Sequence, residues 1–266
     1  MKKNLARMIL LAMVLAFAVP VGAQETKEEV NTGQDFTKPL TRLDIRQKYQ
    51  NLPAGKESYT TTFRVDKPFV LDGGWVLSTR ADLPLMGSDV TSADNPDSDF
   101  KWGMSDFLTQ FLLIAPQGEK SWTYAFGLQT IFPTASEDQM GTGRYQVAPV
   151  LGGKVDLKGI SKGSFAYALI RNHFDAGGSD SRANTNYLVI QPGINIALPK
   201  TFFVTVSPEM KVNWEDNNHW FIPFDVTVGK MLNKSTVVSV EYKTRIHDDK
   251  YRFYDTEIEA RIGFFF

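Results

Sequence analysis

The chain has 266 residues, 42% of them hydrophobic, and its 29 Lys and Arg nearly balance its 30 Asp and Glu, which leaves a net charge of −1. This balance offers no basic surface for nucleic acid, and the absence of cysteine excludes disulfides, thiolate metal sites and a cysteine nucleophile. The negative mean hydropathy excludes a polytopic helical membrane protein, but not a membrane β-barrel, in which apolar and polar residues alternate.

The first 23 residues have the three parts of a secretory signal peptide. Lys2, Lys3 and Arg7 precede an apolar run over residues 8–19, and small residues at 21–23 mark a cleavage point. The apolar run is shorter than the roughly 20 residues that a membrane-spanning helix needs. We therefore expect export across the inner membrane of a Gram-negative bacterium. Residues 24–38 are polar and acidic without a hydrophobic period, which predicts a flexible periplasmic tail before a barrel over residues 39–266.

From residue 41 onward apolar residues recur at every second position, which is the pattern of β-strands. The runs are mostly about 10–15 residues long, near or above the 9–11 that a tilted strand needs to cross a bilayer and longer than typical strands of a soluble β-sandwich. The sequence therefore predicts an all-β fold, a transmembrane antiparallel up-and-down barrel. We expect about twelve strands, at 41–50, 58–70, 75–86, 105–115, 121–133, 143–156, 163–174, 184–198, 201–214, 218–231, 235–247 and 251–266.

Loop lengths support this count and give the barrel an orientation. Long polar connections at 87–103, 135–141 and 175–183 follow odd-numbered strands, whereas tight connections at 71–74, 198–200 and 232–234 follow even-numbered ones. Outer-membrane barrels have long loops outside and short turns in the periplasm. An even count also returns the C-terminus to the periplasmic side. The last strand alternates and ends in Phe266, which resembles the C-terminal signal read by the barrel-assembly machinery.

Assigning alternate residues to the inside gives a lumen with two different walls. The first and last strands carry charges of both signs inward, which we expect either to pair with one another or simply to hydrate the interior. The members of this charged wall are Arg42, Arg46, Arg64, Arg80, Asp82, Glu241, Lys243, Arg245, Glu257, Glu259 and Arg261, together with Asp44, Lys48, Asp66 and Asp255. The apolar wall comprises Tyr187, Val189, Phe203 and Phe221, with Ile170 and Asn172 beside them. These residues either line a solute path or fill a narrow or plugged barrel.

Several phrases of the sequence resemble one family of outer-membrane barrels. They are FGLQTIFPTAS at 126–136, MGTGRYQVAP at 140–149, GWVLSTRADLP at 74–84, LVIQPGIN at 188–195 and WFIPFDVTVGK at 220–230. The sequence resembles the family named for the meta-pathway of phenol degradation (MetA-pathway phenol degradation-like). The resemblance implies an outer-membrane barrel surrounded by lipid, with a role in the uptake of small, often hydrophobic or aromatic, molecules.

Two other classes of function stay open. A lipid hydrolase or protease could have its active site at the extracellular rim, but none of His173, His219 and His247 begins the His-x-Ser pair of outer-membrane lipid hydrolases. A structural or adhesive barrel would need no conducting lumen. No metal-ligand spacing occurs, and the acidic stretch at 89–99 is expected to be an ordinary surface loop, so we expect no enzyme activity, cofactor or metal.

Overall fold

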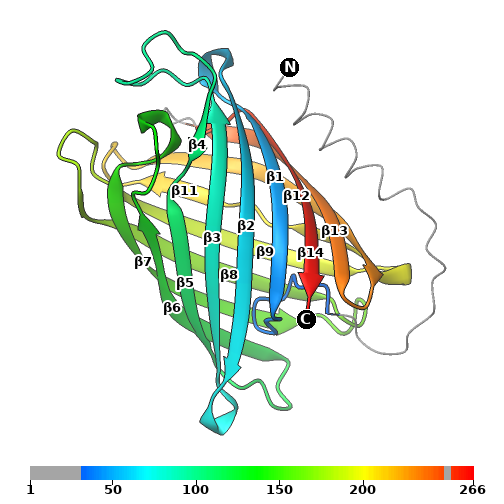
Figure 1. Ribbon diagram of the computed structural model, residues 1–266. Helices are drawn as coiled ribbons and strands as arrows, with labels where there is room; N and C mark the ends of the chain where they lie inside the picture. The colour runs from blue at the N-terminus through cyan, green and yellow to red at the C-terminus, as the bar shows by residue number, and fades with distance from the viewer. Residues whose placement is uncertain (1–30, 249–252) are drawn as a thin grey trace.

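Strands of one antiparallel sheet form the body of the protein. The computed structural model describes residues 31–248 and 253–266, so the predicted signal peptide lies outside the described residues (Figure 1). The described strands are β1 (Arg42–Asn51), β2 (Glu57–Val70), β3 (Val76–Ser88), β4 (Lys101–Met104), β5 (Phe107–Ile114), β6 (Trp122–Phe132), β7 (Arg144–Asp156), β8 (Phe165–Gly178), β9 (Asn186–Ala197), β10 (Phe202–Val206), β11 (Met210–Asn213), β12 (His219–Asn233), β13 (Thr236–Asp248) and β14 (Thr256–Phe265). Within the described residues, no helix has the length and hydropathy needed to cross a membrane.

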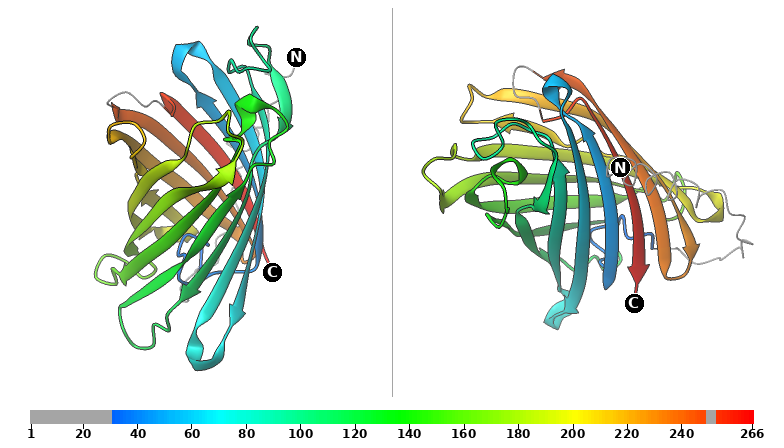
Figure 2. Two further views of the ribbon diagram at one scale, coloured as in Figure 1. Left: turned by 90° about the vertical axis from the view of Figure 1, so that its left-hand side faces the viewer. Right: turned by 45° about the horizontal axis from the view of Figure 1, so that its top comes forward.

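The sheet closes on itself. Strands that follow one another in the sequence pair, except β4 with β5 and β10 with β11. β14 pairs with β1 over the full length of both, with Arg46 opposite Arg261 (Figures 1 and 2). Two places in the ring are each filled by a pair of short strands, because β4 and β5 both pair with β3, while β10 and β11 both lie between β9 and β12. The described strands therefore form a closed barrel of twelve, which confirms the predicted fold.

Proline accounts for both interruptions. The sequence predicted one continuous strand over 201–214, and it placed residues 101–103 of β4 in the connection 87–103. Pro208 lies between β10 and β11 and has no N–H to donate to a neighbouring strand. Pro84 of β3 lies opposite the gap between β4 and β5. There Leu85 pairs with Met104 and Asp82 with Leu108, so the interrupted strand carries one extra residue, a β-bulge.

The predicted alternation sorts apolar side chains to the outside of the barrel. Large apolar residues are exposed on strands all around the ring, while polar and charged residues from the same strands are buried inside. On β7, for example, Leu151 is 57% exposed, whereas Lys154 is buried. A wall with an apolar outer face and a polar inner face is the arrangement that suits a barrel in lipid.

The two ends of the barrel differ. One end, called the turn end here, carries the β2–β3, β9–β10 and β12–β13 connections and the exposed Phe266, whose amide donates to the carbonyl of Thr41 (3.0 Å). The opposite, loop end carries the longer connections, including residues 89–100 between β3 and β4, which rise above the rim (Figure 1). This is the predicted division of short and long connections.

The segment before β1 is folded into the barrel. Asp35 and Thr37 are buried, and Phe36 packs against apolar residues of β5, β7 and β8 inside the turn end. The prediction of a flexible tail over residues 24–38 is therefore wrong for residues 31–38, while residues 24–30 lie outside the described part. The polar composition of the segment did not indicate that Phe36 packs against apolar residues inside the barrel.

Candidate functional site: the barrel lumen

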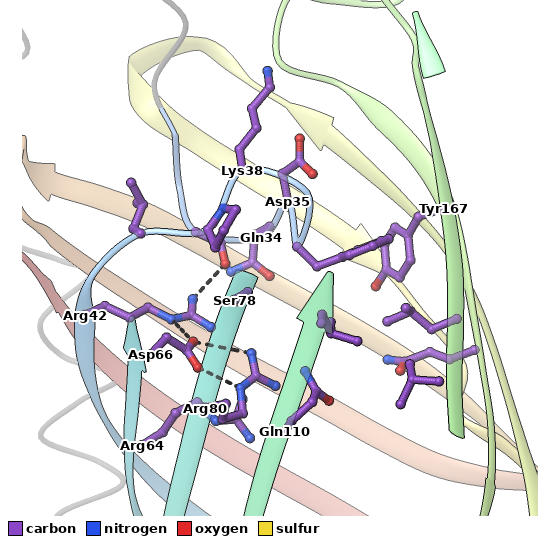
Figure 3. Close-up of a pocket in the computed structure, with 18 of the residues that line it drawn as sticks. Gln34, Asp35, Lys38, Arg42, Arg64, Asp66, Ser78, Arg80, Gln110 and Tyr167 are labelled. Carbon is purple, nitrogen blue, oxygen red and sulfur yellow. Dashed lines mark hydrogen bonds and ion pairs between the residues drawn. The ribbon is translucent and has the colours of Figure 1, made fainter. Parts of the chain in front are cut away.

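The inner faces of β1, β2, β3 and β14 carry a network of arginine–carboxylate pairs. Strand register produces the network, since Arg64 lies opposite Asp82, and Asp66 opposite both Arg42 and Arg80. Arg64 donates two hydrogen bonds to Asp82 (2.7 and 2.6 Å). Asp66 accepts from Arg80 (2.8 Å) and Arg42 (2.5 Å) (Figure 3). Bidentate arginine–carboxylate pairs fix both partners, so this wall is rigid.

Two further pairs extend the arginine network around the closure of the barrel. Arg46 of β1 pairs with Glu259 of β14 (2.5 Å), and Arg261 of β14 pairs with the fully buried Asp44 of β1 (3.1 Å). These pairs connect the first strand to the last, over the same seam that the backbone ladder closes. The four side chains lie together at this seam.

Predicted charges of β13 and β14 form an acid-rich cluster with Asp225 of β12, and this cluster adjoins the arginine network where Glu241 lies opposite Glu259. Lys243 contacts Glu257 (3.0 Å), Glu241 (3.1 Å) and Asp225 (3.8 Å). Nearer the loop end, Arg245 pairs with Asp255 (3.0 Å). The single charged wall expected from the sequence is thus divided into an arginine-rich part and a lysine-centred part with more carboxylates.

Two cavities lie inside the barrel, one above the other. The turn-end cavity, of about 180 Å³, lies between the arginine network and residues 33–40 (Figure 3). The loop-end cavity, of about 200 Å³, lies between β3, β5, β6, β8 and β9. Both are lined by Arg64, Arg80 and Arg171, so these three guanidinium groups mark the place where the cavities meet.

Arg171 of β8 was not among the residues that the sequence pointed to. It reaches the lumen from the wall opposite β2 and β3, and its Nη2 donates to Gln191 (2.9 Å) and Glu209 (3.1 Å). The alternation of residues predicted Ile170 and Asn172 inside instead, but Ile170 is 42% exposed on the outer face. Both faces of β8 carry apolar residues, since Leu169 points inward against Phe36, so hydropathy alone did not give the facing of this strand.

The four residues of the predicted apolar wall are divided among three places. Tyr187 and Val189 line the loop-end cavity. Phe203 is buried with Met231 and Val237 near the turn end, and Phe221 packs edge-on against Phe253 and Tyr254, with ring centroids 5.2 and 5.0 Å away. Tyr254 is buried as well. Phe203 and Phe221 thus point inward, but they pack in clusters of their own.

The turn end of the lumen is occupied by residues 31–40. Asp35 pairs with Lys154, whose side chain is completely buried (3.1 Å), and also accepts hydrogen bonds from the amide and hydroxyl of Thr37 (2.9 and 2.6 Å). Phe36 lies against Leu169 and the cluster of Leu112 and Val150. A charge pair and an aromatic anchor thus hold the segment across the turn end.

The facing wall is built to receive this segment. Ala125, Ala148 and Gly152 turn small or absent side chains inward. A Cβ atom at Gly152 would lie 2.5 Å from Leu169 and 3.1 Å from the Phe36 ring. Small inward residues together with the inward Lys154 were the sequence signal that could have indicated an internal partner.

The contacts of His173 and His219 are with an aromatic ring, an amide and a carboxylate. His173 stacks on Tyr187 (centroids 4.4 Å apart, planes 8° apart) and shares a hydrogen bond with Gln146 (3.2 Å). His219 contacts Asp216 (2.9 Å) at the loop end. His247 is followed by Asp248, whereas Asp249 lies outside the described residues.

The acidic loop after β3 is held by hydrogen bonds. Asp94 accepts from the hydroxyl of Ser92 (2.5 Å) and the amide of Asp138 (2.9 Å), and these bonds lower the pKa of its carboxyl. Asn95 donates to the carbonyls of Val90 and Asp99. The loop is therefore tied both to itself and to the β6–β7 connection.

Comparison with solved structures identifies barrels of the same architecture. A search of protein-family models and of curated proteins finds no match. The crystal structure of an outer membrane channel from Pseudomonas putida F1 superposes with a TM-score of 0.71 at 12% identity, covering 91% of this chain and 100% of that one. The KdgM porin gives 0.55 at 12% identity, covering 85% and 99%. Outer membrane phospholipase A from Escherichia coli gives 0.50 at 12% identity, covering 85% and 92%.

These likenesses establish the fold. The chain has the architecture of outer-membrane β-barrels, and the solved structures that share it include channels, porins and an enzyme. The choice between passage and catalysis has to come from the residues inside the barrel.

Proposed function

We propose that the protein is an outer-membrane channel, of the family named for the meta-pathway of phenol degradation, that passes small molecules through its lumen. The observation that carries the proposal is the pair of cavities that meet at Arg64, Arg80 and Arg171 inside a closed barrel. Together they run from the loop end to the segment 31–40. A polar interior surrounded by an apolar outer wall is the arrangement of a channel in lipid.

The segment 31–40 acts as an internal plug in this proposal. It borders the turn-end cavity and is attached by contacts that can be made and broken without opening the barrel ladder: the Asp35–Lys154 pair, the Phe36 contacts and the bond from Arg42 to the carbonyl of Gly33 (2.8 Å). Passage then requires the plug to shift. The outer face contacts membrane lipid, and the last strand, ending in Phe266, serves in assembly.

The test is conductance of the purified mature protein in planar bilayers, with Asp35→Asn/Phe36→Ala as the variant that loosens the plug. We expect small, infrequent openings in the wild type and a several-fold higher mean conductance in the variant. Phe69→Ala is the matched control, because Phe69 is exposed on the outer face of β2. A wild type and a plug variant that both show no conductance, while folded, would refute passage.

Catalysis is the second candidate, and one contact keeps it in the experiment. His219 and Asp216 at the loop end have the spacing of a histidine and its orienting carboxylate, on a fold shared with a phospholipase. The described contacts of His219 include no hydroxyl nucleophile, which favours passage over hydrolysis. Release of fatty acid from phospholipid vesicles by the same sample, abolished in His219→Ala, would support an enzyme instead.

A further inference from the structure

The loop-end cavity has an amphipathic lining. One side is polar and carries the guanidinium groups of Arg64, Arg80 and Arg171 together with the carboxylates of Asp82 and Glu209. Another side is apolar, and it comprises Leu108, Ile131, Tyr187 and Val189, from β5, β6 and β9. These residues come from strands distant in sequence, and the barrel brings both kinds to one space.

The arginines are turned toward the lumen more than most of the carboxylates that neutralise them. The side chain of Arg80 is 24% exposed and that of its partner Asp66 is 5% exposed. Arg64 is 17% exposed against 9% for Asp82, and Arg46 is 20% exposed against 13% for Glu259. Asp66 and Glu259 thus lie behind their guanidinium partners, whereas Asp82 and Glu209 line the cavity beside Arg64 and Arg171. A solute in the cavity therefore meets three guanidinium groups, two of them next to a carboxylate that also lines the cavity.

Arg171 has a hydrogen-bond donor that its described contacts do not use. Its hydrogen bonds to Gln191 and Glu209 both leave from Nη2. Its buried Nε has no hydrogen-bond partner among the described residues. A buried guanidinium nitrogen without an acceptor costs free energy, which an incoming anion would recover. Glu209 is the exposed acid of this group, and Lys211 (3.3 Å) shares it with Arg171.

We infer that the loop-end cavity is a binding site for small carboxylates with an apolar body. The carboxylate is held by Arg64, Arg80 and Arg171, and the body contacts Tyr187, Val189, Leu108 and Ile131. This inference rests on the proposed channel function and names its substrate class. Guanidinium groups suit this task because their planar donors match the two oxygens of a carboxylate.

The site also predicts what the channel discriminates against. An uncharged analogue of the same shape gives the arginines no new acceptor. A small carboxylate without an apolar body leaves the apolar side of the cavity empty. A cation meets three guanidinium groups of like charge. Benzoate, benzyl alcohol, acetate and benzylamine are therefore the four probes.

The experiment titrates each probe into the purified mature protein in detergent by isothermal titration calorimetry, so that binding is measured without conduction. We expect benzoate to bind about tenfold or more tightly than the other three. Arg171→Gln should weaken benzoate about tenfold, Arg171→Lys should restore part of that loss, and Tyr187→Ala should weaken benzoate while leaving acetate unchanged. Arg182→Gln, which removes a guanidinium from the loop-end connections, is the matched control and should bind like the wild type.

The outcomes separate the site from the channel. Equal affinity for benzoate and benzyl alcohol, or benzoate binding that survives in folded Arg171→Gln and Arg80→Gln proteins, overturns the carboxylate site even where the protein conducts. Arginine-dependent benzoate binding by a protein that never conducts supports the site and refutes passage. Heat-modifiable mobility on gels shows that each variant is folded.

Discussion

Single carboxylates inside the barrel position more than one arginine. Asp66 of β2 is buried and accepts hydrogen bonds from Arg42 of β1 and Arg80 of β3, the two strands that neighbour β2. An inward arginine that loses its acceptor is left as an unpaired charge in a confined space, which costs more than the pair itself contributes. The carboxylates thus determine where the guanidinium groups of the lumen point.

The change Asp66→Asn tests this role. Because the buried Arg42 and the half-buried Arg80 lose their charged partner at once, we expect the free energy of unfolding to fall by about 3 kcal/mol. Urea unfolding of the protein in micelles, followed by tryptophan fluorescence, measures the change. Asp72→Asn, in the exposed β2–β3 connection, is the control and should shift stability by less than about 0.5 kcal/mol. Equal effects of the two substitutions would show that Asp66 does not position Arg42 and Arg80.

For single residues, the sequence predicted which side of the barrel wall a side chain faces better than it predicted which residues surround that side chain. Alternation placed Arg42, Arg64 and Asp82 inside, and the strand register then paired them. It did not distinguish Tyr187, which lines a cavity, from Phe203, which packs under Gly229 in a cluster at the turn end. That difference depends on what the opposite wall contributes, and a period of two residues carries no information about the opposite wall.

Among the elements, the segment 31–40 departs most from its prediction. A run of polar residues without a hydrophobic period is normally solvated, since it cannot bury enough apolar surface to offset the entropy of ordering. Here contacts inside the barrel offset this entropy, because Lys154 supplies a buried charge for Asp35 and Gly152 leaves room for Phe36. The receptor lies on a strand more than 100 residues away, so the local sequence could not reveal it.

Substitution of Gly152 on that strand should displace the plug without altering the plug itself. In Gly152→Val the new Cβ lies 2.5 Å from Leu169 and 3.1 Å from the Phe36 ring, so both side chains must move. Expelling Phe36 relieves part of an overpacking cost of about 1–3 kcal/mol. We expect faster hydrogen exchange of the amides at 31–38 and a higher mean conductance in the same variant.

Gly153 provides the matched control for this experiment. It is the next residue of β7, and a Cβ atom there would meet only the carbonyl oxygen of Thr123, at 3.9 Å. Gly153→Val should leave both the exchange rates and the conductance of the wild type. Unchanged exchange at 31–38 in a folded Gly152→Val protein would mean that Phe36 does not hold the segment.

For the whole molecule, the sequence determined the barrel because one pattern repeats around the ring. A one-residue slip in any strand exchanges its inner and outer faces, so strands such as β1 and β14, with charges on one face and apolar residues on the other, have a single acceptable register. The exceptions are β4/β5 and β10/β11, where proline interrupts the ladder without changing the order of the ring. The number of strands is therefore more robust than their individual boundaries.

The outer face carries the last prediction, because a membrane band makes the cost of a charge depend on depth. Leu151 and Val155 both point outward on β7, Leu151 near the middle of the strand and Val155 one residue from its turn-end limit. An arginine at the midplane of the bilayer costs about 2–4 kcal/mol, whereas near the interface it costs about 0–1 kcal/mol. Leu151→Arg should therefore lower the free energy of unfolding in phospholipid vesicles by several times the amount that Val155→Arg does. In detergent, where the apolar thickness adapts to the protein, the difference should shrink. Equal costs at the two positions in vesicles would mean that the apolar outer wall does not face a bilayer of defined thickness, and the barrel would then need another apolar partner to cover it.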